Sequence, residues 1–145
     1  MRRVQNAVFV HLVWATWDRL PLLVGAIERD IRRAIESKCK TLGIEIVAFG
    51  GVEDHIHLLV RLPATLAVAD VVKHLKGAST HLLTQRLHPD DFFKWQGAYG
   101  AFSVSLDHLG QVGEYIGRQR EHHAHNTTIA AWELPPTSHG NGGGE

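Results

Sequence analysis

Two pairs of residues in this 145-residue chain have the types and spacing that phosphate chemistry needs. His55 and His57 flank Ile56 in an apolar segment, and Tyr115 precedes Gln119 by four residues. On a strand the two imidazoles share a face and can hold a divalent metal ion. On a helix Tyr115 and Gln119 share a face, one turn apart. A metal ion that holds a phosphate, and a tyrosine hydroxyl that attacks it, would together break and rejoin a phosphodiester.

The His-x-His pattern is weak by itself. With 11 histidines in 145 residues, about one such pair is expected by chance, and His123-Ala124-His125 is a second example. Side chains two apart share a face on a strand but diverge by about 200° on a helix. We expect His123 and His125 on a helix, so only His55 and His57 converge. The alternatives are a pair of hydrogen-bonded sheet histidines without a metal and two surface histidines that lie together by accident.

The segment around Tyr115 adds a polar face that surrounds one aromatic ring. The alternatives are that Tyr115 is a core residue with its hydroxyl at the rim and that Gln119 is solvated. Three glycines in this segment each cost about 1 kcal/mol relative to Ala in a helix interior; they are Gly110, Gly113 and Gly117. They indicate either a mobile helix or close packing against a neighbour.

Hydrophobic periodicity predicts the elements that must position these residues. We expect strands at 6–14, 44–49, 55–62 and 99–105, and helices at 27–42, from a Thr65 cap to Leu82, and from an Asp107 cap to about His125. The order of the first six elements is that of a ferredoxin-like split βαβ fold. The sequence therefore predicts an α+β domain: an antiparallel sheet with helices on one face, plus an additional C-terminal helix that carries Tyr115. The third strand, with the histidine pair, should be central.

Composition limits the kind of protein. With 44% hydrophobic residues, we expect one domain over 1–132 and a disordered Pro/Gly-rich tail over 133–145. Fifteen basic and 15 acidic residues cancel, so any phosphate-binding surface must be local. Cys39 has no disulfide partner, and no run approaches the roughly 20 apolar residues of a membrane span. We expect a cytoplasmic protein with no membrane partner.

Several motifs occur in the order found in one known family. The chain resembles the single-tyrosine HUH transposases of small insertion sequences, including the REP-associated tyrosine transposases. The resemblance rests on His11-Leu12-Val13-Trp14, 50–60, Leu75-Lys76-Gly77, Trp95-Gln96, 99–105 and 115–123.

The resemblance implies a specific chemistry and partner. His55, His57 and Gln119 would hold Mg²⁺ or Mn²⁺, and Tyr115 would attack DNA to give a 5′-phosphotyrosine and a free 3′-hydroxyl. The DNA would be single-stranded with hairpin ends. The protein would be a homodimer in which the tyrosine helix can act in trans, with the cis arrangement left open. Because two imidazoles form a softer shell than Mg²⁺ usually takes, we expect Mn²⁺ to work at least as well. No general base can be named, and the metal or Arg118 must help to deprotonate Tyr115.

A local cationic surface could bind the DNA backbone. The candidates are Lys73, Lys76, Arg86, Lys94, Arg118 and Arg120. Trp95, Tyr99 or Phe102 could stack on unpaired bases. The alternative is that the cations are solvated and the aromatics, Phe102 above all, are core. A second function is a catalytically silent or domesticated DNA-hairpin binder, but binding alone requires neither the histidine pair nor Tyr115 and Gln119.

Overall fold

A computed structural model describes residues 5–125 and 128–134. The four strands are β1 (Phe9–Ala15), β2 (Glu45–Val52), β3 (His55–Arg61) and β4 (Gly100–Val104). The α-helices are α1 (Gly25–Leu42), α2 (Val68–Leu82), α3 (Leu109–Gly117) and α4 (Gln119–Ala124). Short 3-10 turns lie at Trp17–Arg19, Leu106–His108 and Ala130–Trp132, and a π turn at Leu83–Leu87 extends α2.

The strands form one antiparallel sheet in the order β2-β3-β1-β4. This order confirms the predicted α+β, ferredoxin-like fold. β3 is an inner strand, as expected, and lies between β2 and β1. In the pairing of β1 with β3, Val13 is opposite His57 and Ala15 is opposite His55. The histidine pair is therefore fixed from both sides by backbone hydrogen bonds.

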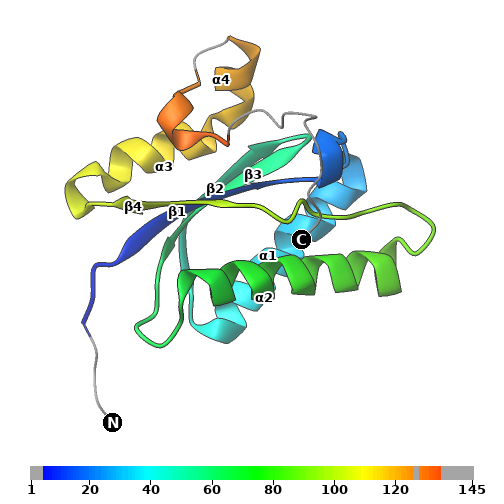
Figure 1. Ribbon diagram of the computed structural model, residues 1–145, viewed down its shortest axis with the longest axis horizontal. Coiled ribbons are helices and arrows are strands. Elements are labelled where there is room, and N and C mark those ends of the chain that lie inside the picture. The colour runs from blue at the N-terminus through cyan, green and yellow to red at the C-terminus, as the bar shows by residue number, and fades with distance from the viewer. Residues whose placement is uncertain (1–4, 126–127, 135–145) are drawn as a thin grey trace, which may run out of the picture.

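The two faces of the sheet have different partners. Helices α1 and α2 cover one face, where alternate side chains of β1 and β3, such as Leu12 and Leu58, enter the larger core. Helix α3 packs on the opposite face over a smaller cluster that includes Leu59 and Ile116. Figure 1 shows α1 and α2 on one side of the sheet and α3 and α4 on the other. The histidine pair points to the α3 side.

Helix α3 approaches β2 closely at one glycine. A Cβ atom on Gly50 would lie 2.8 Å from the carbonyl carbon of Ile116 and closer still to its oxygen. Only a residue without a side chain permits this approach. By contrast, a Cβ on Gly110 or Gly117 would meet open space. A Cβ on Gly113 would make ordinary contacts with Ala48 at 3.8 Å and Leu59 at 4.0 Å, so the closest approach of α3 to the sheet is at Gly50.

The predicted third helix is not continuous. Asp107 lies in a 3-10 turn, α3 ends at Gly117, and Arg118 has φ −110° and ψ 27° before α4 begins at Gln119. The weak helix propensity of the glycines accounts for an interruption at this point. Helix α2 also begins later than expected: its N-cap is Ala67, so Thr65 does not cap it.

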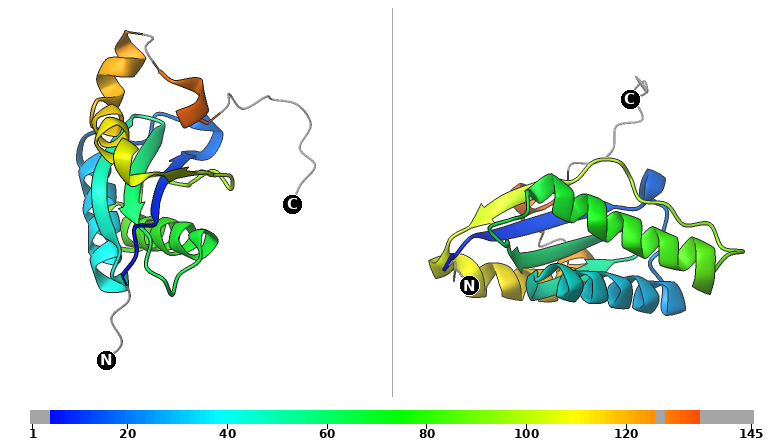
Figure 2. Two further views of the ribbon diagram at one scale, coloured as in Figure 1. Left: turned by 90° about the vertical axis from the view of Figure 1, so that its left-hand side faces the viewer. Right: turned by 90° about the horizontal axis from the view of Figure 1, so that it is seen from below.

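The C-terminal part of the described chain returns to the sheet. Figure 2 shows that the segment after α4 folds back beside the strands. Glu133 and Leu134, at the start of the predicted tail, are within the described residues, whereas 135–145 lie outside them. The division at residue 132 stays a prediction. Among the described helices, none combines the length and apolar character that crossing a membrane requires.

Candidate active site

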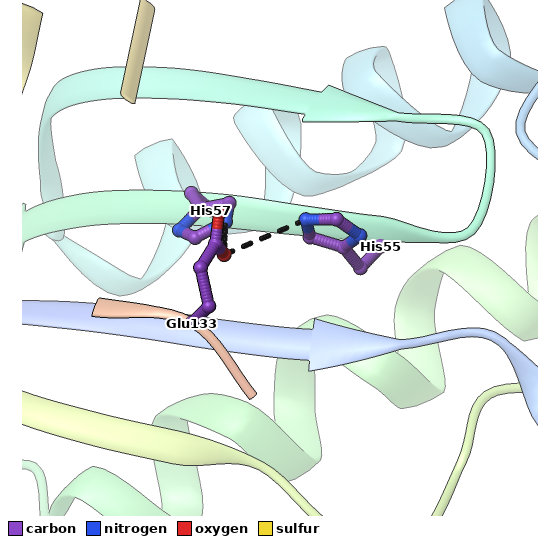
Figure 3. Close-up of side chains that lie close together, drawn as sticks. All are labelled: His55, His57 and Glu133. Atoms are coloured by element: carbon purple, nitrogen blue, oxygen red, sulfur yellow. Dashed lines mark ion pairs between the residues drawn. The ribbon is translucent and has the colours of Figure 1, made fainter. Parts of the chain in front are cut away.

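His55 and His57 lie at the start of β3, where a strand period of two puts both rings on one face. Both side chains are buried, and their ring centroids are 5.1 Å apart. Between them lies the carboxylate of Glu133, which belongs to the segment that follows α4. Figure 3 shows this carboxylate pointing toward both imidazoles. The convergence predicted for the histidine pair is therefore present, with a carboxylate added.

Three buried atoms meet here. Glu133 Oε2 lies 2.6 Å from His57 Nε2 and 3.6 Å from His55 Nε2. Within the described part of the chain, none of the three has an aligned hydrogen-bond partner. The ligand atoms of these residues all lie within 4.8 Å of one another. Because buried polar atoms are normally satisfied, three that converge on one point fit a divalent cation with a nitrogen, nitrogen and oxygen donor set.

Each histidine has an outer hydrogen-bond partner at Nδ1. His55 Nδ1 lies 2.7 Å from Asp54 Oδ1, and His57 Nδ1 lies 2.8 Å from His11 Nε2. Burial alone would raise the pKa of Asp54, but His55, with help from Arg19, lowers it below its usual value. Burial, and then the charge of His57, lowers the pKa of His11 to about 4. Such partners fix ring orientation and tautomer at metal sites.

Tyr115 lies beside this cluster on α3. Its hydroxyl donates a hydrogen bond to Glu133 Oε1 (3.0 Å) and accepts one from the backbone N–H of Ile129 (2.9 Å). Its ring stacks on His122 at 4.5 Å and meets Trp132 edge-on at 5.0 Å. Only 4% of Tyr115 is exposed. The segment from Ile129 to Glu133 thus covers the tyrosine.

The charges of the cluster are set by its burial. Desolvation lowers the pKa of His57, which favours a neutral ring at neutral pH. For Glu133, burial would raise the pKa, but the 2.6 Å contact with His57 and the charge of that ring more than offset this and bring it to about 2. Burial, opposed by the N–H of Ile129 and reinforced by Glu133, raises the pKa of Tyr115. The cluster therefore holds a carboxylate and a phenol that keeps its proton.

Gln119 is buried next to the cluster but is not one of the three converging atoms. Its Oε1 lies 3.1 Å from His123 Nε2, and its Nε2 donates to the carbonyl of Tyr115 at 3.4 Å. His123 Nε2 also lies 3.1 Å from Glu133 Oε1. Despite the break in the helix, Tyr115 and Gln119 both reach the site from the same chain as the histidine pair.

The six candidate cations do not form one surface. Lys73 and Lys76 lie on α2, on one side of the sheet, whereas Arg118 and Arg120 lie at α4 on the other. The remaining two, Arg86 and Lys94, lie on the chain between α2 and β4. The ammonium of Lys76 donates to the carbonyls of Gln96 and Ala98, and Lys94 lies 3.9 Å above the Trp17 ring. Arg118 and Arg120 pair with glutamates.

Of the three aromatic residues considered for base stacking, Trp95 is excluded. It is buried against Trp14 and Phe93, and its Nε1–H donates to Ser79 Oγ at 2.9 Å. Phe102 is partly buried, with its ring 5.7 Å from that of His11. Tyr99 is 38% exposed.

Three residues of the site are not among those predicted from the sequence. Glu133 follows no periodic pattern and was placed in the tail. His11 enters the sequence prediction only through the His11-Leu12-Val13-Trp14 motif, and His123 only as a helical residue that does not converge with His125. The one available signal was that His11 and His57 both occupy the less apolar faces of strands expected to pair, which would have placed them together.

A pocket of about 440 Å³ opens at His55. Its lining includes two arginines and a further histidine from the site, Arg19, Arg120 and His123. Arg19 lies 3.9 Å from Asp54 and 3.5 Å from the carbonyl of Leu134. The pocket gives solvent and ligands a route to the edge of the three-atom cluster.

The sequence of this chain matches one family of known proteins. Residues 4–119 match the family model described as "Transposase IS200 like". The ISDra2 transposase TnpA of Deinococcus radiodurans is 28% identical over 118 residues, covering 77% of this chain and 83% of that protein. The transposase for insertion sequence element IS200 of Salmonella typhimurium is 24% identical, covering 77% and 76%.

Two solved structures share the fold. The crystal structure of a candidate transposase from D. radiodurans R1 has a TM-score of 0.61 and 27% identity, over 80% of this chain and 95% of that one. The structure of a REP-associated tyrosine transposase bound to a REP hairpin has a TM-score of 0.64 and 16% identity, over 85% and 74%.

Proposed function

This chain is a member of the IS200-like transposase family, whose enzymes act on DNA, and we propose that it nicks and rejoins single-stranded DNA through a covalent bond to Tyr115. One observation carries the proposal: a tyrosine hydroxyl and two buried imidazole nitrogens meet the two oxygens of a single carboxylate, Glu133. One carboxylate thus contacts both a nucleophile and a cation site, and this proximity is what attack on a phosphodiester requires.

His55 and His57 would hold the cation through Nε2, and an oxygen would complete the protein ligands. The resemblance assigns that oxygen to Gln119, while Glu133 Oε2, at 2.6 Å from His57 Nε2 and 3.6 Å from His55 Nε2, is a second candidate. When bound, Mg²⁺ or Mn²⁺ would neutralise charge on the phosphoryl oxygens. The mixed nitrogen and oxygen donor set favours Mn²⁺ in vitro.

The covalent step balances with residues of this chain. Tyr115 Oη would form a bond to phosphorus as its proton passes to Glu133 Oε1, the bond from phosphorus to the 3′ oxygen would break, and Glu133 would return the proton to that oxygen, which leaves as a 3′-hydroxyl. The hydrogen bond of 3.0 Å from the phenol to Glu133 Oε1 supports this carboxylate as the proton acceptor, provided that the bound cation lowers the pKa of Tyr115. The 5′-phosphotyrosine conserves the bond energy, so a second 3′-hydroxyl can reverse the reaction without ATP.

DNA must first reach a tyrosine that is only 4% exposed. The residues that cover Tyr115, Ile129 and Trp132 among them, are therefore displaced when the strand enters. The pocket beside His55 offers the approach, and Arg19 and Arg120 in its lining are suited to backbone phosphates.

We further propose that the substrate carries a DNA hairpin, since a structural relative was solved with a REP hairpin. Exposed cations, chiefly Lys73, Arg86 and Lys94, are candidates for its backbone. The homodimer with a tyrosine helix acting in trans stays a prediction, because Tyr115 and the histidine pair already meet within one chain.

The test uses oligonucleotides from the DNA that flanks the gene, each with a hairpin and a label at its 3′ end. With Mn²⁺, the wild type should give a protein–DNA adduct that carries the 3′ label and survives denaturation. Tyr115→Phe should give none, and His57→Ala should give far less. Equal adduct from wild type and Tyr115→Phe would refute the proposal. Hairpin binding without any adduct would leave the alternative function, a silent DNA-hairpin binder.

A further inference from the structure

We propose that His11 is a positioning residue for the cation site, because it holds the ring of His57 with Nε2 directed at Glu133. No step of the proposed reaction uses His11, yet it is one of the few fully buried polar residues of the described chain, with 1% of its surface exposed. The inference rests on the proposed metal-dependent function and adds an outer contact to it.

The contact crosses from one inner strand to the other. His11 belongs to β1 and is opposite Leu59 of β3, so His57 is its diagonal neighbour on the same face. His11 Nε2 lies 2.8 Å from His57 Nδ1, and the ring centroids are 5.0 Å apart. Backbone pairing fixes both strands, and the geometry of the contact is set by the sheet rather than by a loop.

The direction of the hydrogen bond follows from the role of His57. An imidazole that binds a cation through Nε2 must carry its proton on Nδ1, and that proton needs an acceptor. The atom at that place is His11 Nε2. The proton of His11 then lies on its own Nδ1, which has no hydrogen-bond partner in the described part of the chain. The hydrogen bond to His57 Nδ1 therefore leaves Nδ1 of His11 buried without a partner among the described residues.

The same arrangement exists for the other histidine. Asp54 Oδ1 accepts the Nδ1 proton of His55 at 2.7 Å, which leaves Nε2 of His55 directed at Glu133. His11 and Asp54 thus have the same role: each accepts the Nδ1 proton of one histidine of the pair. A side chain needed only for packing would be better apolar, since the neighbouring ring on this side is that of Phe102.

The test measures Mn²⁺ affinity of the full-length protein without DNA, by titration calorimetry. Loss of an outer partner of a metal-bound histidine typically weakens metal binding by 10–100-fold. We expect that loss in His11→Phe, which keeps a ring but removes the acceptor. His11→Gln, whose amide oxygen can accept the same proton, should stay within about 3-fold of wild type. Phe102→Leu, which changes packing against His11 without touching its nitrogens, should bind Mn²⁺ like wild type.

Two results would overturn the role of His11: wild-type affinity in His11→Phe, or a loss in His11→Gln as large as in His11→Phe. A second measurement does not depend on a variant that folds. In ¹⁵N-histidine-labelled wild type with Mg²⁺, NMR should show the proton of His57 on Nδ1, and a proton on Nε2 would contradict the proposal. Failure of His57→Ala to lower Mn²⁺ affinity would instead refute the metal site of the proposed function.

Discussion

Gly50→Ala should disturb the reaction by displacing α3 from β2, without altering any side chain of the site. The new Cβ would lie 2.8 Å from the carbonyl carbon of Ile116 and closer still to its oxygen, where ordinary contacts begin at about 3.4 Å. The obstacle is helix backbone and cannot rotate away. Helix α3 must therefore move off β2, and it carries Tyr115, the residue before Ile116.

The size of the effect follows from this contact. Relief of the overlap needs a shift of about 1 Å, and overpacking of this kind costs about 1–3 kcal/mol. For a chain of this length, each kcal/mol lowers Tm by about 3 °C. A misplacement of about 1 Å at a reacting group can slow the chemical step about 100-fold. Gly50→Ala should thus lose far more activity than stability.

The assay compares adduct formation with saturating hairpin DNA and Mn²⁺, alongside thermal melting. Gly77→Ala is the matched control, because Gly77 lies inside α2 and a Cβ there would meet nothing within 4 Å. That control should be stabilised by about 1 kcal/mol and react at the wild-type rate. If Gly50→Ala also reacts at the wild-type rate, the packing of α3 on β2 does not position Tyr115, and the reasoning is wrong.

Three further predictions concern ligands, pH and the supporting core. Glu133→Ala should weaken Mn²⁺ binding more than Gln119→Ala, and the reverse order in calorimetry would make Gln119 the third ligand. Folding lowers the pKa of His11 from 6.5 to about 4, so the unfolded chain takes up the proton first as pH falls. The free energy of unfolding in EDTA should therefore decrease between about pH 6.5 and 4, by up to about 3 kcal/mol, and an equally large decrease in His11→Phe would contradict this. Ser79→Ala removes the acceptor of the buried Trp95 Nε1–H and should lower the free energy of unfolding, measured with urea, by about 1–3 kcal/mol. Thr84→Ala is the control, because it loses only a hydrogen bond to Thr80 of its own helix, and it should lower that free energy by less than about 1 kcal/mol.

The sheet and the histidine pair could be predicted because they depend on local patterns. A strand period of two shows which side chains share a face, and the order of elements gives the sheet topology with β3 inside. The face shared by His55 and His57 follows from these two facts alone. The sequence also places Tyr115 and Gln119 near each other, and this proximity remains even though Arg118 interrupts the helix.

Contacts between distant segments could not be predicted in the same way. Glu133 enters the site from a short segment without periodicity, where composition indicates a tail. Its position depends on the ring contact of Trp132 with Tyr115 and on the Ile129 N–H, neither of which leaves a sequence pattern. The sequence leaves open whether Trp95 stacks on bases or lies in the core, and the contact that decides it, from its N–H to Ser79 of α2, joins segments 16 residues apart.

The central claim is that one chain brings a cation site and a tyrosine nucleophile to the same phosphate. Its most direct measurement is mass spectrometry of the adduct formed with hairpin DNA and Mn²⁺, after digestion of both protein and DNA. We predict one modified peptide, with a 5′-phosphonucleotide on Tyr115, that disappears when EDTA replaces Mn²⁺ or when His57 is changed to alanine. A nucleotide attached at another residue, or attached to Tyr115 equally well in EDTA, would contradict the account.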